Sequence, residues 1–254
     1  MDLTRPIVAG IIPARYGSTR LPGKALRAIL GKPMVQRVLE QSLKARVLDA
    51  VYVATDDARI FDAVEKCGGH AIMTSPDHPS GTDRLAEAAT QIDADIVVNI
   101  QGDQPFIDPR MIEECVQPLL DDPALPIATL MHPIHREEDL TDPGVVKVVT
   151  DMAGNALYFS RSLVPYPRQV NAHDVYEHVG LYAYRKDFLV LLAKLPPALL
   201  EQVESLEQLR VLEHGYKLRV IATNVRDNGF SGFSVDTEED LARAEAMLRE
   251  RGVE

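Results

Sequence analysis

A short stretch near the amino terminus, IIPARYGSTRLPGKAL, gathers residue types that bind phosphate. An apolar run up to Ile12 leads into a loop that holds Arg15, Arg20 and Lys24. Arginine binds phosphate oxygens through paired N–H groups, lysine acts as a point charge, and the loop glycines let backbone N–H groups approach an anion. The spacing is not that of a Walker A loop, and a merely solvated basic loop is the alternative. We expect this loop, with Ser18, to bind a triphosphate.

Two aspartates stand where a metal ion could be held beside that triphosphate. Asp103, in NIQGDQP, comes just after an apolar run that ends at Ile100, and Asp236 stands in SVDTEEDL. Mg2+ prefers one or two carboxylates together with phosphate oxygens and water. From the residues alone, Asp236 suits a helix start at least as well, because Asp followed by Thr and two Glu is typical of one. We therefore expect Asp103 to hold Mg2+, with Asp236 as its candidate partner.

A third segment, SGTDRLAEA, predicts a turn that leads into a helix. Thr82 and Arg84 would lie near its first turn, where backbone N–H groups favour an anion or the polar edge of a base. The same pattern is common at ordinary helix starts, so a purely structural role stays open. Gln101 is a candidate to read cytosine or ribose, and backbone groups of Pro13, Ala14 and Arg15 are further candidates for base selection.

Alternating strands and helices must position these residues. Apolar, β-branched runs predict strands at Ile7–Ile12, Val51–Ala54 and Asp95–Ile100. Segments of helical period predict helices at Met34–Ala45, Ala58–Cys67 and Arg84–Gln91. The alternation predicts βαβ units around a parallel sheet, and ligands bind at the carboxyl ends of such strands. The phosphate-binding loop and Asp103 would both lie at that edge.

The pattern changes after Pro126 to the shorter strand candidates IATLMHP, VVKVVT, ALYFS and HVGLYAY, which predict an antiparallel addition to the sheet. Two amphipathic helices are predicted at Val203–Glu213 and Glu238–Arg249. The loop Pro165–Asp174, rich in proline and polar residues, is our candidate for a mobile segment.

We interpret the chain as a single domain, residues 1–254, with three regions of different duty. Residues 1–125 would mainly bind nucleotide, residues 126–235 would mainly bind the acceptor and mediate dimerisation, and residues 236–254 would form a closing helix. A chain of 254 residues, 46% of them hydrophobic, is long enough to bury one full core.

Composition excludes several functional classes. The formal net charge of -11 disfavours a nonspecific grip on nucleic acid, which needs basic surface. The run Ile7–Ile12 is far shorter than the roughly 20 residues that cross a bilayer, so no membrane partner is expected. Cys67 and Cys115 lack CxxC spacing, which argues against a disulfide framework or a zinc site and favours the cytoplasm.

The motifs also resemble those of a known family. PARYGSTRLPGK is similar to the signature of the sugar nucleotidyltransferases, and its PAR opening to the CMP-sugar synthetase branch. VATDD, SGTDRLAEA, VNIQGDQPFI, NALYFSRSLVPYP, HVGLYAYR, ESLEQLRVLEHG and SVDTEEDLARA follow in an order that resembles the CMP-KDO synthetases, where KDO is 3-deoxy-manno-octulosonate. The resemblance covers nearly the whole chain. It implies a Rossmann-like, GT-A-type α/β fold with a mixed, mostly parallel sheet and a smaller antiparallel lobe.

The resemblance also implies an activity. Members of that family form homodimers and transfer CMP from CTP to the anomeric hydroxyl of KDO, releasing pyrophosphate, and the product feeds lipopolysaccharide synthesis. Asp103 and Asp236 match the positions that hold Mg2+ at the reacting phosphate. Together with Arg15 and Lys24 they would form the catalytic group.

Five further residues match positions that the family uses around KDO. They are Arg161, His178, Tyr182, Glu207 and Gln208. An arginine suits the acceptor carboxylate, and the other side chains suit its hydroxyls. Each also has a structural interpretation, as a strand residue, a core residue or part of an exposed helix face.

Three other functions stay open at this point. One is cytidylyl transfer to a different acidic acceptor, such as an amino-KDO, a nonulosonate or a phosphonate. Another is a glycosyltransferase of the same general fold, although GDQ stands where a DxD motif would be expected. The last is a binding protein that takes up CTP without turnover.

Overall fold

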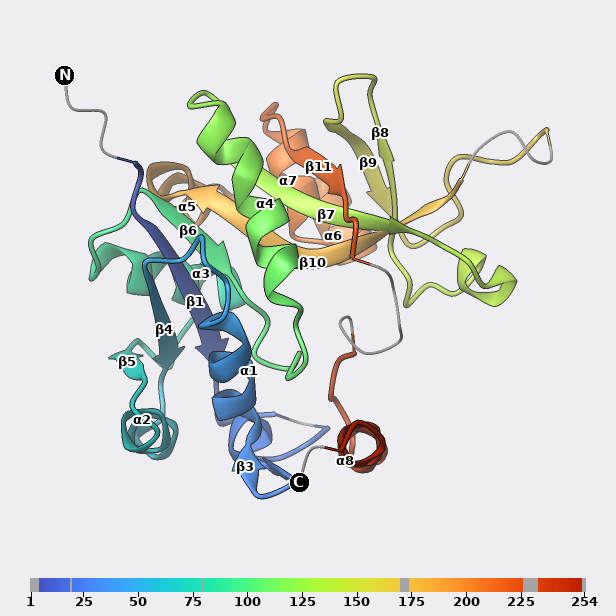
Figure 1. The fold of residues 1–254 in the computed structure, drawn as a ribbon. Helices are drawn as coiled ribbons and strands as arrows, with labels where there is room; N and C mark the ends of the chain where they lie inside the picture. The colour runs from blue at the N-terminus through green and yellow to red at the C-terminus, as the bar shows by residue number, and fades with distance from the viewer. Residues whose placement is uncertain (1–4, 19, 79, 170–173, 226–232, 253–254) are drawn as a thin grey trace.

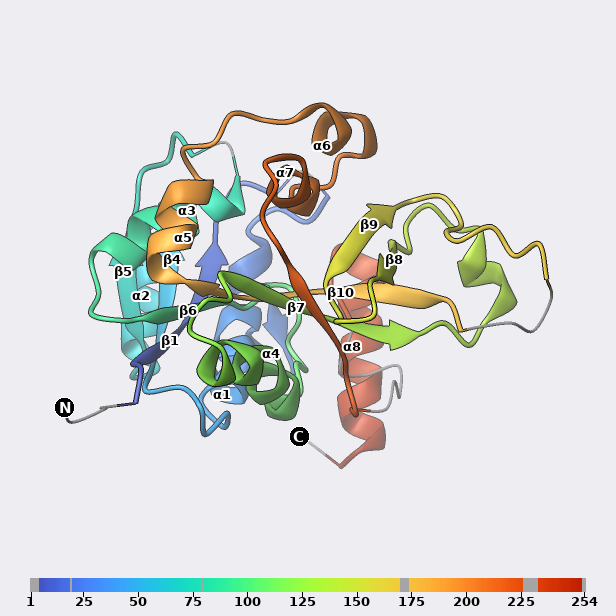
Figure 2. The same ribbon diagram turned by 90° about the horizontal axis from the view of Figure 1, so that it is seen from above.

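The computed structural model describes residues 5–18, 20–78, 80–169, 174–225 and 233–252. Within these residues one nine-stranded mixed sheet runs through the molecule, and helices cover both of its faces (Figures 1 and 2). The sheet path is β11-β7-β10-β6-β1-β4-β5. These strands are β1 (Val8–Ala14), β4 (Ala50–Thr55), β5 (His70–Met73), β6 (Ile96–Asn99), β7 (Ile127–Pro133), β10 (Tyr176–Arg185) and β11 (Arg219–Ala222).

The amino-terminal half of the sheet is parallel. β1 pairs in parallel with both β4 and β6, and β4 pairs in parallel with β5. β10 then runs antiparallel to β6 and β7, so the chain direction reverses beside the centre of the sheet. Outside this path, β8 (Lys147–Thr150) and β9 (Ala156–Ser160) form an antiparallel hairpin attached to β10. This hairpin is the predicted antiparallel lobe.

The helices form two layers. One layer holds α1 (Met34–Ser42), α2 (Ala58–Lys66) and α4 (Pro109–Asp121), and the other holds α3 (Gly81–Thr90) and α5 (Lys186–Leu192) (Figure 2). Two short helices, α6 (Leu199–Glu204) and α7 (Gln208–Glu213), follow α5. The smaller elements are η1 (Lys24–Leu26), β2 (Ala28–Ile29), β3 (Lys32–Pro33) and η2 (Glu137–Leu140).

The strands are apolar on both sides because both faces of the sheet are covered. On β1, Ile12 packs towards α1 and α4, whereas Ile11 packs towards α3, and both side chains are fully buried. Continuous apolar runs are what a doubly covered parallel sheet requires. Burial of these side chains is the main force that fixes the sheet and, with it, the loops at its carboxyl-terminal edge.

The last helix, α8 (Glu238–Glu250), returns to the amino-terminal half, where it packs against the β2–β3 hairpin (Figure 1). Its apolar side chains, including Leu241 and Leu248, pack with Leu21, Ile29 and Met34 in a separate cluster. Thr237 caps the helix by accepting a hydrogen bond from the backbone N–H of Asp240 at 3.2 Å. The carboxyl-terminal segment is thereby fixed against the phosphate-binding loop.

Most predicted elements of the amino-terminal half are confirmed, with shifted ends. The prediction of one helix over Val203–Glu213 is wrong, because the structure has α6 and α7 with Ser205 between them at a left-handed φ of 53°. Among the described residues, β5, α4, α5 and β11 were not predicted, and neither were the short elements η1, β2, β3 and η2. The loop prediction Pro165–Asp174 lies partly outside the described residues, so its mobility stays a prediction.

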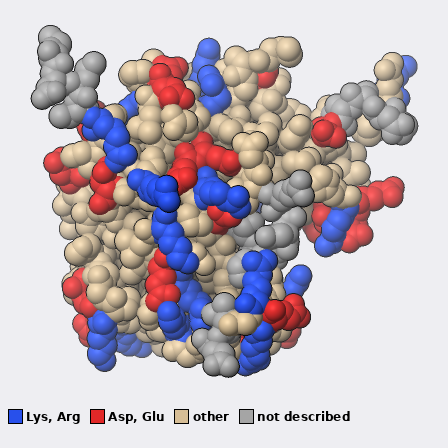
Figure 3. Space-filling view, viewed as in Figure 1, with Lys and Arg blue, Asp and Glu red and all other residues tan. Residues whose placement is uncertain are grey.

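Acidic and basic side chains are interspersed on the face shown in Figure 3. Among the described residues, no helix combines the length and the apolar character that crossing a membrane requires.

Candidate active site

A cavity of about 470 Å3 opens at the carboxyl-terminal edge of the parallel strands. The end of β1 supplies Pro13 and Ala14, and the loop that follows supplies the predicted phosphate-binding side chains Arg15, Ser18, Arg20 and Lys24. Arg84, Gln101, Asp103, Asp236 and Glu207, the last of these predicted for the acceptor, complete the set of predicted residues in this wall. The structure therefore brings together residues that are more than 200 positions apart in the sequence.

Lys24 lies between the two predicted metal ligands. Its Nζ is 2.8 Å from Oδ2 of Asp103 and 2.7 Å from Oδ1 of Asp236. Arg20 also donates to Oδ1 of Asp236, at 2.9 Å. The backbone N–H of Val235 donates to the carbonyl of Asp103 at 2.9 Å, which ties the segment before α8 to the loop after β6. Two carboxylates and two cations thus face one another at the floor of the cavity.

This arrangement fits a magnesium ion. The two carboxylates approach one cationic nitrogen, and Mg2+ is commonly held by one or two carboxylates with phosphate oxygens and water as its remaining ligands. The described residues contain no cluster of three or more His, Cys, Asp or Glu side chains able to hold a metal.

Gly102 allows the loop after β6 to lie directly against β1. A Cβ atom at this position would stand 2.7 Å from the carbonyl oxygen of Pro13. That contact is too short for any side chain, and the neighbouring atom is backbone, which cannot turn away. Glycine at this position therefore sets the distance between Asp103 and the phosphate-binding loop.

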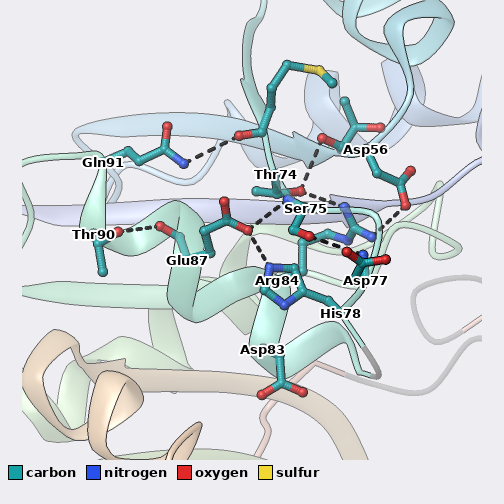
Figure 4. Close-up of polar contacts among 12 residues, drawn as sticks. Asp56, Thr74, Ser75, Asp77, His78, Asp83, Arg84, Glu87, Thr90 and Gln91 are labelled. Carbon is teal, nitrogen blue, oxygen red and sulfur yellow. Dashed lines mark hydrogen bonds and ion pairs between the residues drawn. The ribbon is translucent and has the colours of Figure 1, made fainter.

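Arg84 is held rigidly in the cavity wall by residues from neighbouring elements (Figure 4). Its Nη2 donates to Asp56 at 2.7 Å and its Nη1 donates to Oγ1 of Thr74 at 2.5 Å. Arg84 is 4% exposed. It lies in the first turn of α3, which Ser80 caps by accepting from the N–H of Asp83. The cap and the ion pair fix the guanidinium before any ligand arrives.

His78 is a cavity residue that the sequence analysis missed. It lines the large cavity, and its Nε2 contacts Oε2 of Glu87, which also accepts from the backbone N–H of Ser75 at 2.9 Å (Figure 4). The hydrogen bond with His78 is the largest cause of the lowered pKa of Glu87. The sequence feature that could have indicated His78 is its position two residues before the SGTDR motif.

A second cavity, of about 190 Å3, adjoins the first. Three of the five residues matched to the acceptor site line it, namely Tyr182, Glu207 and Gln208. Gln101 and Glu207 line both cavities, so they form the boundary between them. Gln101 is held there by donating through Nε2 to the carbonyl of Gly180 at 3.0 Å.

Thr82 connects the helix layer around the first cavity to the wall of the second. It lines the smaller cavity, and its Oγ1 donates to Oε2 of Glu207 at 2.6 Å. The predicted nucleotide role of Thr82 stays a prediction, whereas its place beside Glu207 is a feature of the fold. This hydrogen bond joins the start of α3 to the segment that precedes α7.

Arg161 and His178 lie beside the second cavity without lining it. The Arg161 guanidinium donates to the carbonyl oxygens of Glu204 and Pro143, each at 2.8 Å. A third bond runs from Nη2 to the carbonyl of Ser205 at 3.4 Å. Arg161 therefore supports the turn between α6 and α7, in which Ser205 directly follows Glu204. The role of Arg161 towards an acceptor carboxylate stays a prediction.

Three ring side chains of β10, those of His178, Tyr182 and Tyr184, are held uncharged. The His178 ring packs between Phe159, at a centroid distance of 5.0 Å, and Tyr182, at 5.3 Å. Burial lowers the pKa of His178 to about 3. Burial also raises the pKa of Tyr182 and Tyr184, so both hydroxyls stay protonated. These groups offer directional hydrogen bonds and no charge.

Comparison with known proteins agrees with this geometry. The cytidylyltransferase family profile matches residues 9–219. The 3-deoxy-manno-octulosonate cytidylyltransferase of Syntrophotalea carbinolica is 51% identical over 251 residues, covering 95% of this chain and 98% of that protein. The counterpart from Syntrophus aciditrophicus is 51% identical over 243 residues, covering 94% and 96%.

A solved structure has the same fold over almost the whole chain. The structure of CMP:2-keto-3-deoxy-manno-octonic acid synthetase in complex with CTP has a TM-score of 0.90 and 46% identity, and the match covers 96% of this chain and 99% of that one. The predicted fold, a nucleotidyltransferase fold with a mixed sheet, flanking helices and an antiparallel lobe, is confirmed. The chain belongs to the cytidylyltransferase family and, within it, to the 3-deoxy-manno-octulosonate cytidylyltransferases.

Proposed function

We propose that this chain transfers CMP from CTP to the anomeric hydroxyl of KDO and releases pyrophosphate. The observation that carries the proposal is the pair of adjoining cavities, one rich in cationic side chains and the other in uncharged hydrogen-bonding groups. A triphosphate fits the first and a polyhydroxylated acceptor fits the second. Both cavities reach Gln101 and Glu207, so the two substrates would meet at that boundary.

The chain's own cations bind and orient the triphosphate. Arg15, Arg20 and Lys24 lie in the large cavity, where they would neutralise the charge that grows on the phosphates as the acceptor hydroxyl attacks the α-phosphorus in line with the leaving pyrophosphate. Arg84, which Asp56 holds in place, adds a fourth cationic side chain to this wall. Positioning and charge neutralisation would supply most of the rate.

We propose Asp103 and Asp236 as the residues that hold Mg2+ in this site. A bound magnesium ion supplies positive charge at the phosphates and orients their oxygens. With it in place, Lys24 would be free to leave the two carboxylates, which are its partners at 2.8 and 2.7 Å, and contact a phosphate. Asp103→Asn removes one of the two carboxylates without changing the size of the side chain.

The acceptor cavity supports KDO as substrate. Tyr182 and Gln208 are uncharged and suit hydroxyls, and Glu207 offers a carboxylate that accepts hydrogen bonds. The similarity to proteins that carry the name 3-deoxy-manno-octulosonate cytidylyltransferase points to the same acceptor. The product would feed lipopolysaccharide synthesis.

The proposed working form is a cytoplasmic homodimer. Two free cysteines, Cys67 and Cys115, suit a reducing compartment. The β8–β9 hairpin carries the exposed apolar side chains of Met152 and Leu157, the latter 62% exposed, which suits contact with a second copy. Sedimentation of the wild type and of Leu157→Asp tests this assembly, and a wild type that sediments as a monomer contradicts it.

Pyrophosphate release tests the function itself. The enzyme, CTP and Mg2+ are assayed with KDO, with sialic acid and without acceptor, and UTP and ATP replace CTP as nucleotide controls. We expect release only with CTP and KDO. Release only with another acidic sugar would keep the nucleotide half of the proposal and overturn the acceptor half. No release with any acceptor would favour a CTP-binding protein without turnover.

A further inference from the structure

The smaller cavity contains polar groups that find no partner among the residues that the structure describes. Among the described residues, neither the side-chain amide of Asn99 nor that of Gln208 forms a hydrogen bond, and both side chains line this cavity. Asn99 is 6% exposed and Gln208 is 8% exposed. Gln208 was matched to the acceptor site from its motif, whereas Asn99 was not predicted to have any role.

The sheet fixes the position of Asn99. It is the last residue of β6, and in the antiparallel register it lies directly opposite Tyr182 of β10. Side chains of directly paired residues share one face of a sheet, and so do those of residues two apart along a strand. Asn99 therefore shares its face with Tyr182, and both line the cavity together with Gln101 from the loop after β6.

A buried amide without a partner is costly. The Oδ1 atom of Asn99 is fully buried and accepts no hydrogen bond from the described part of the chain. Leaving such a group unpaired carries a desolvation penalty, which is why nearly all buried polar side chains in proteins have a partner. A ligand that hydrogen-bonds this amide removes the desolvation penalty. The site then favours that ligand over an analogue that lacks the hydrogen-bonding group.

The chemistry of the cavity defines the partner. A primary amide both donates and accepts, as a hydroxyl does, and half a turn about Cβ–Cγ presents either end of the amide. Tyr182 and Tyr184, whose hydroxyls stay protonated, line the same cavity. At about 30 Å3 per water molecule, 190 Å3 corresponds to about six waters, so the space suits a polyhydroxylated group more than a single ion.

We propose that Asn99 is a specificity-determining residue for the acceptor, because its side-chain amide hydrogen-bonds one hydroxyl of the sugar acid other than the reacting anomeric one. This inference rests on the proposed function, since it assumes that the smaller cavity binds the acceptor. It adds a residue of β6 to an acceptor site otherwise drawn from β9, β10 and the α6–α7 region.

The test combines substrate analogues with variants. Wild type, Asn99→Leu and Asn99→Ala are assayed for pyrophosphate release with KDO and with analogues that each lack one hydroxyl. For wild type we expect one analogue to lose roughly 10- to 100-fold in kcat/KM. With KDO, both variants should show a kcat/KM lower than that of wild type by a similar factor. With that analogue their kcat/KM should fall no further, and their KM for CTP should stay unchanged.

A matched control separates this effect from general destabilisation. Asn155 is an equally buried asparagine, 6% exposed, in the β8–β9 hairpin and outside both cavities. Asn155→Leu should keep the wild-type pattern across the analogues. Asn99→Ala adds no apolar bulk. If Asn99→Leu fails to fold, the analogue series with Asn99→Ala tests the role of Asn99.

The outcomes separate the inference from the function on which it rests. Variants of Asn99 that discriminate among the analogues as wild type does would overturn the inference, as would a wild type that accepts every analogue equally. In both cases turnover of KDO itself would leave the proposed function intact. A wild type that releases no pyrophosphate with CTP and KDO would overturn both.

Discussion

The removal of Asp56 tests whether the wall of the nucleotide cavity is built before the nucleotide binds. Asp56 contacts the Arg84 guanidinium at 2.7 Å, and the side chains of Arg84 and Asp56 are 5% and 17% exposed. In Asp56→Ala a buried guanidinium would keep only the hydroxyl of Thr74, at 2.5 Å, as its partner. A buried charge that loses its counter-ion is far more costly than an exposed one.

The expected size of the effect follows from that burial. Breaking a buried ion pair by removing one partner costs about 3–5 kcal/mol, and we expect the lower end because Thr74 stays in place. A loss of about 3 kcal/mol corresponds to a fall in Tm of about 6–12 °C in a chain of this length. The KM for CTP should rise because the guanidinium is no longer held in the wall, while the KM for KDO should not change.

Thermal unfolding and steady-state kinetics measure both effects. The control is Glu138→Gln, which breaks the ion pair between Arg136 and Glu138, whose side chains are 67% and 72% exposed. Such an exposed pair contributes about 0–1 kcal/mol, so the Tm of this variant should stay close to wild type. An Asp56→Ala protein with the Tm and the KM for CTP of wild type would refute the idea that this ion pair fixes Arg84.

Three further predictions follow from the same contacts. Gly102→Ala should lower Tm and raise the KM for CTP, because its Cβ would stand 2.7 Å from the Pro13 carbonyl oxygen. The control is Gly17→Ala, whose Cβ would have no described atom within 4 Å and which should keep the wild-type Tm. Burial acts to raise the pKa of Glu201, but its hydrogen bonds, chiefly with Arg210, hold it below the ordinary value of 4.5. Because the pKa of Glu201 is lower in the folded than in the unfolded protein, its ionised form stabilises the fold above about pH 4.5, and this stabilisation is lost as the pH falls below that value. The Tm of Glu201→Gln should therefore fall less steeply with acid than the Tm of wild type. Asp103→Asn should abolish turnover with an unchanged circular dichroism spectrum, and wild-type turnover would contradict the metal assignment.

The sequence was most informative where one continuous segment carries the chemistry. The loop from Pro13 to Lys24 follows a strand whose apolar run is unmistakable, and the residues predicted from it line one cavity. Asp103 was predictable for the same reason, since an apolar strand delivers it to the carboxyl-terminal edge of the sheet. The resemblance then singled out Asp236, which by its local pattern is a helix start and which the fold brings to the same Lys24 as Asp103.

The acceptor side depends on contacts that no local pattern reveals. Asn99 ends an apolar strand and gains its cavity only through the register with Tyr182 on β10, 83 positions later in the chain. The continuous helical period over residues 203–213 hid the left-handed residue Ser205, which separates α6 from α7. Arg161 supports that same turn, and its contacts are to backbone carbonyls, for which side-chain patterns carry no signal.

The fate of the α-phosphorus of CTP distinguishes CMP transfer to the acceptor from hydrolysis of CTP. The enzyme is supplied with CTP labelled at the α-phosphorus, KDO and Mg2+, and the products are separated and identified by mass. We predict that the label enters a compound made of one CMP and one KDO, in an amount equal to that of the unlabelled pyrophosphate released. Label recovered as free CDP or CMP, or left in CTP while KDO is present, would contradict this prediction.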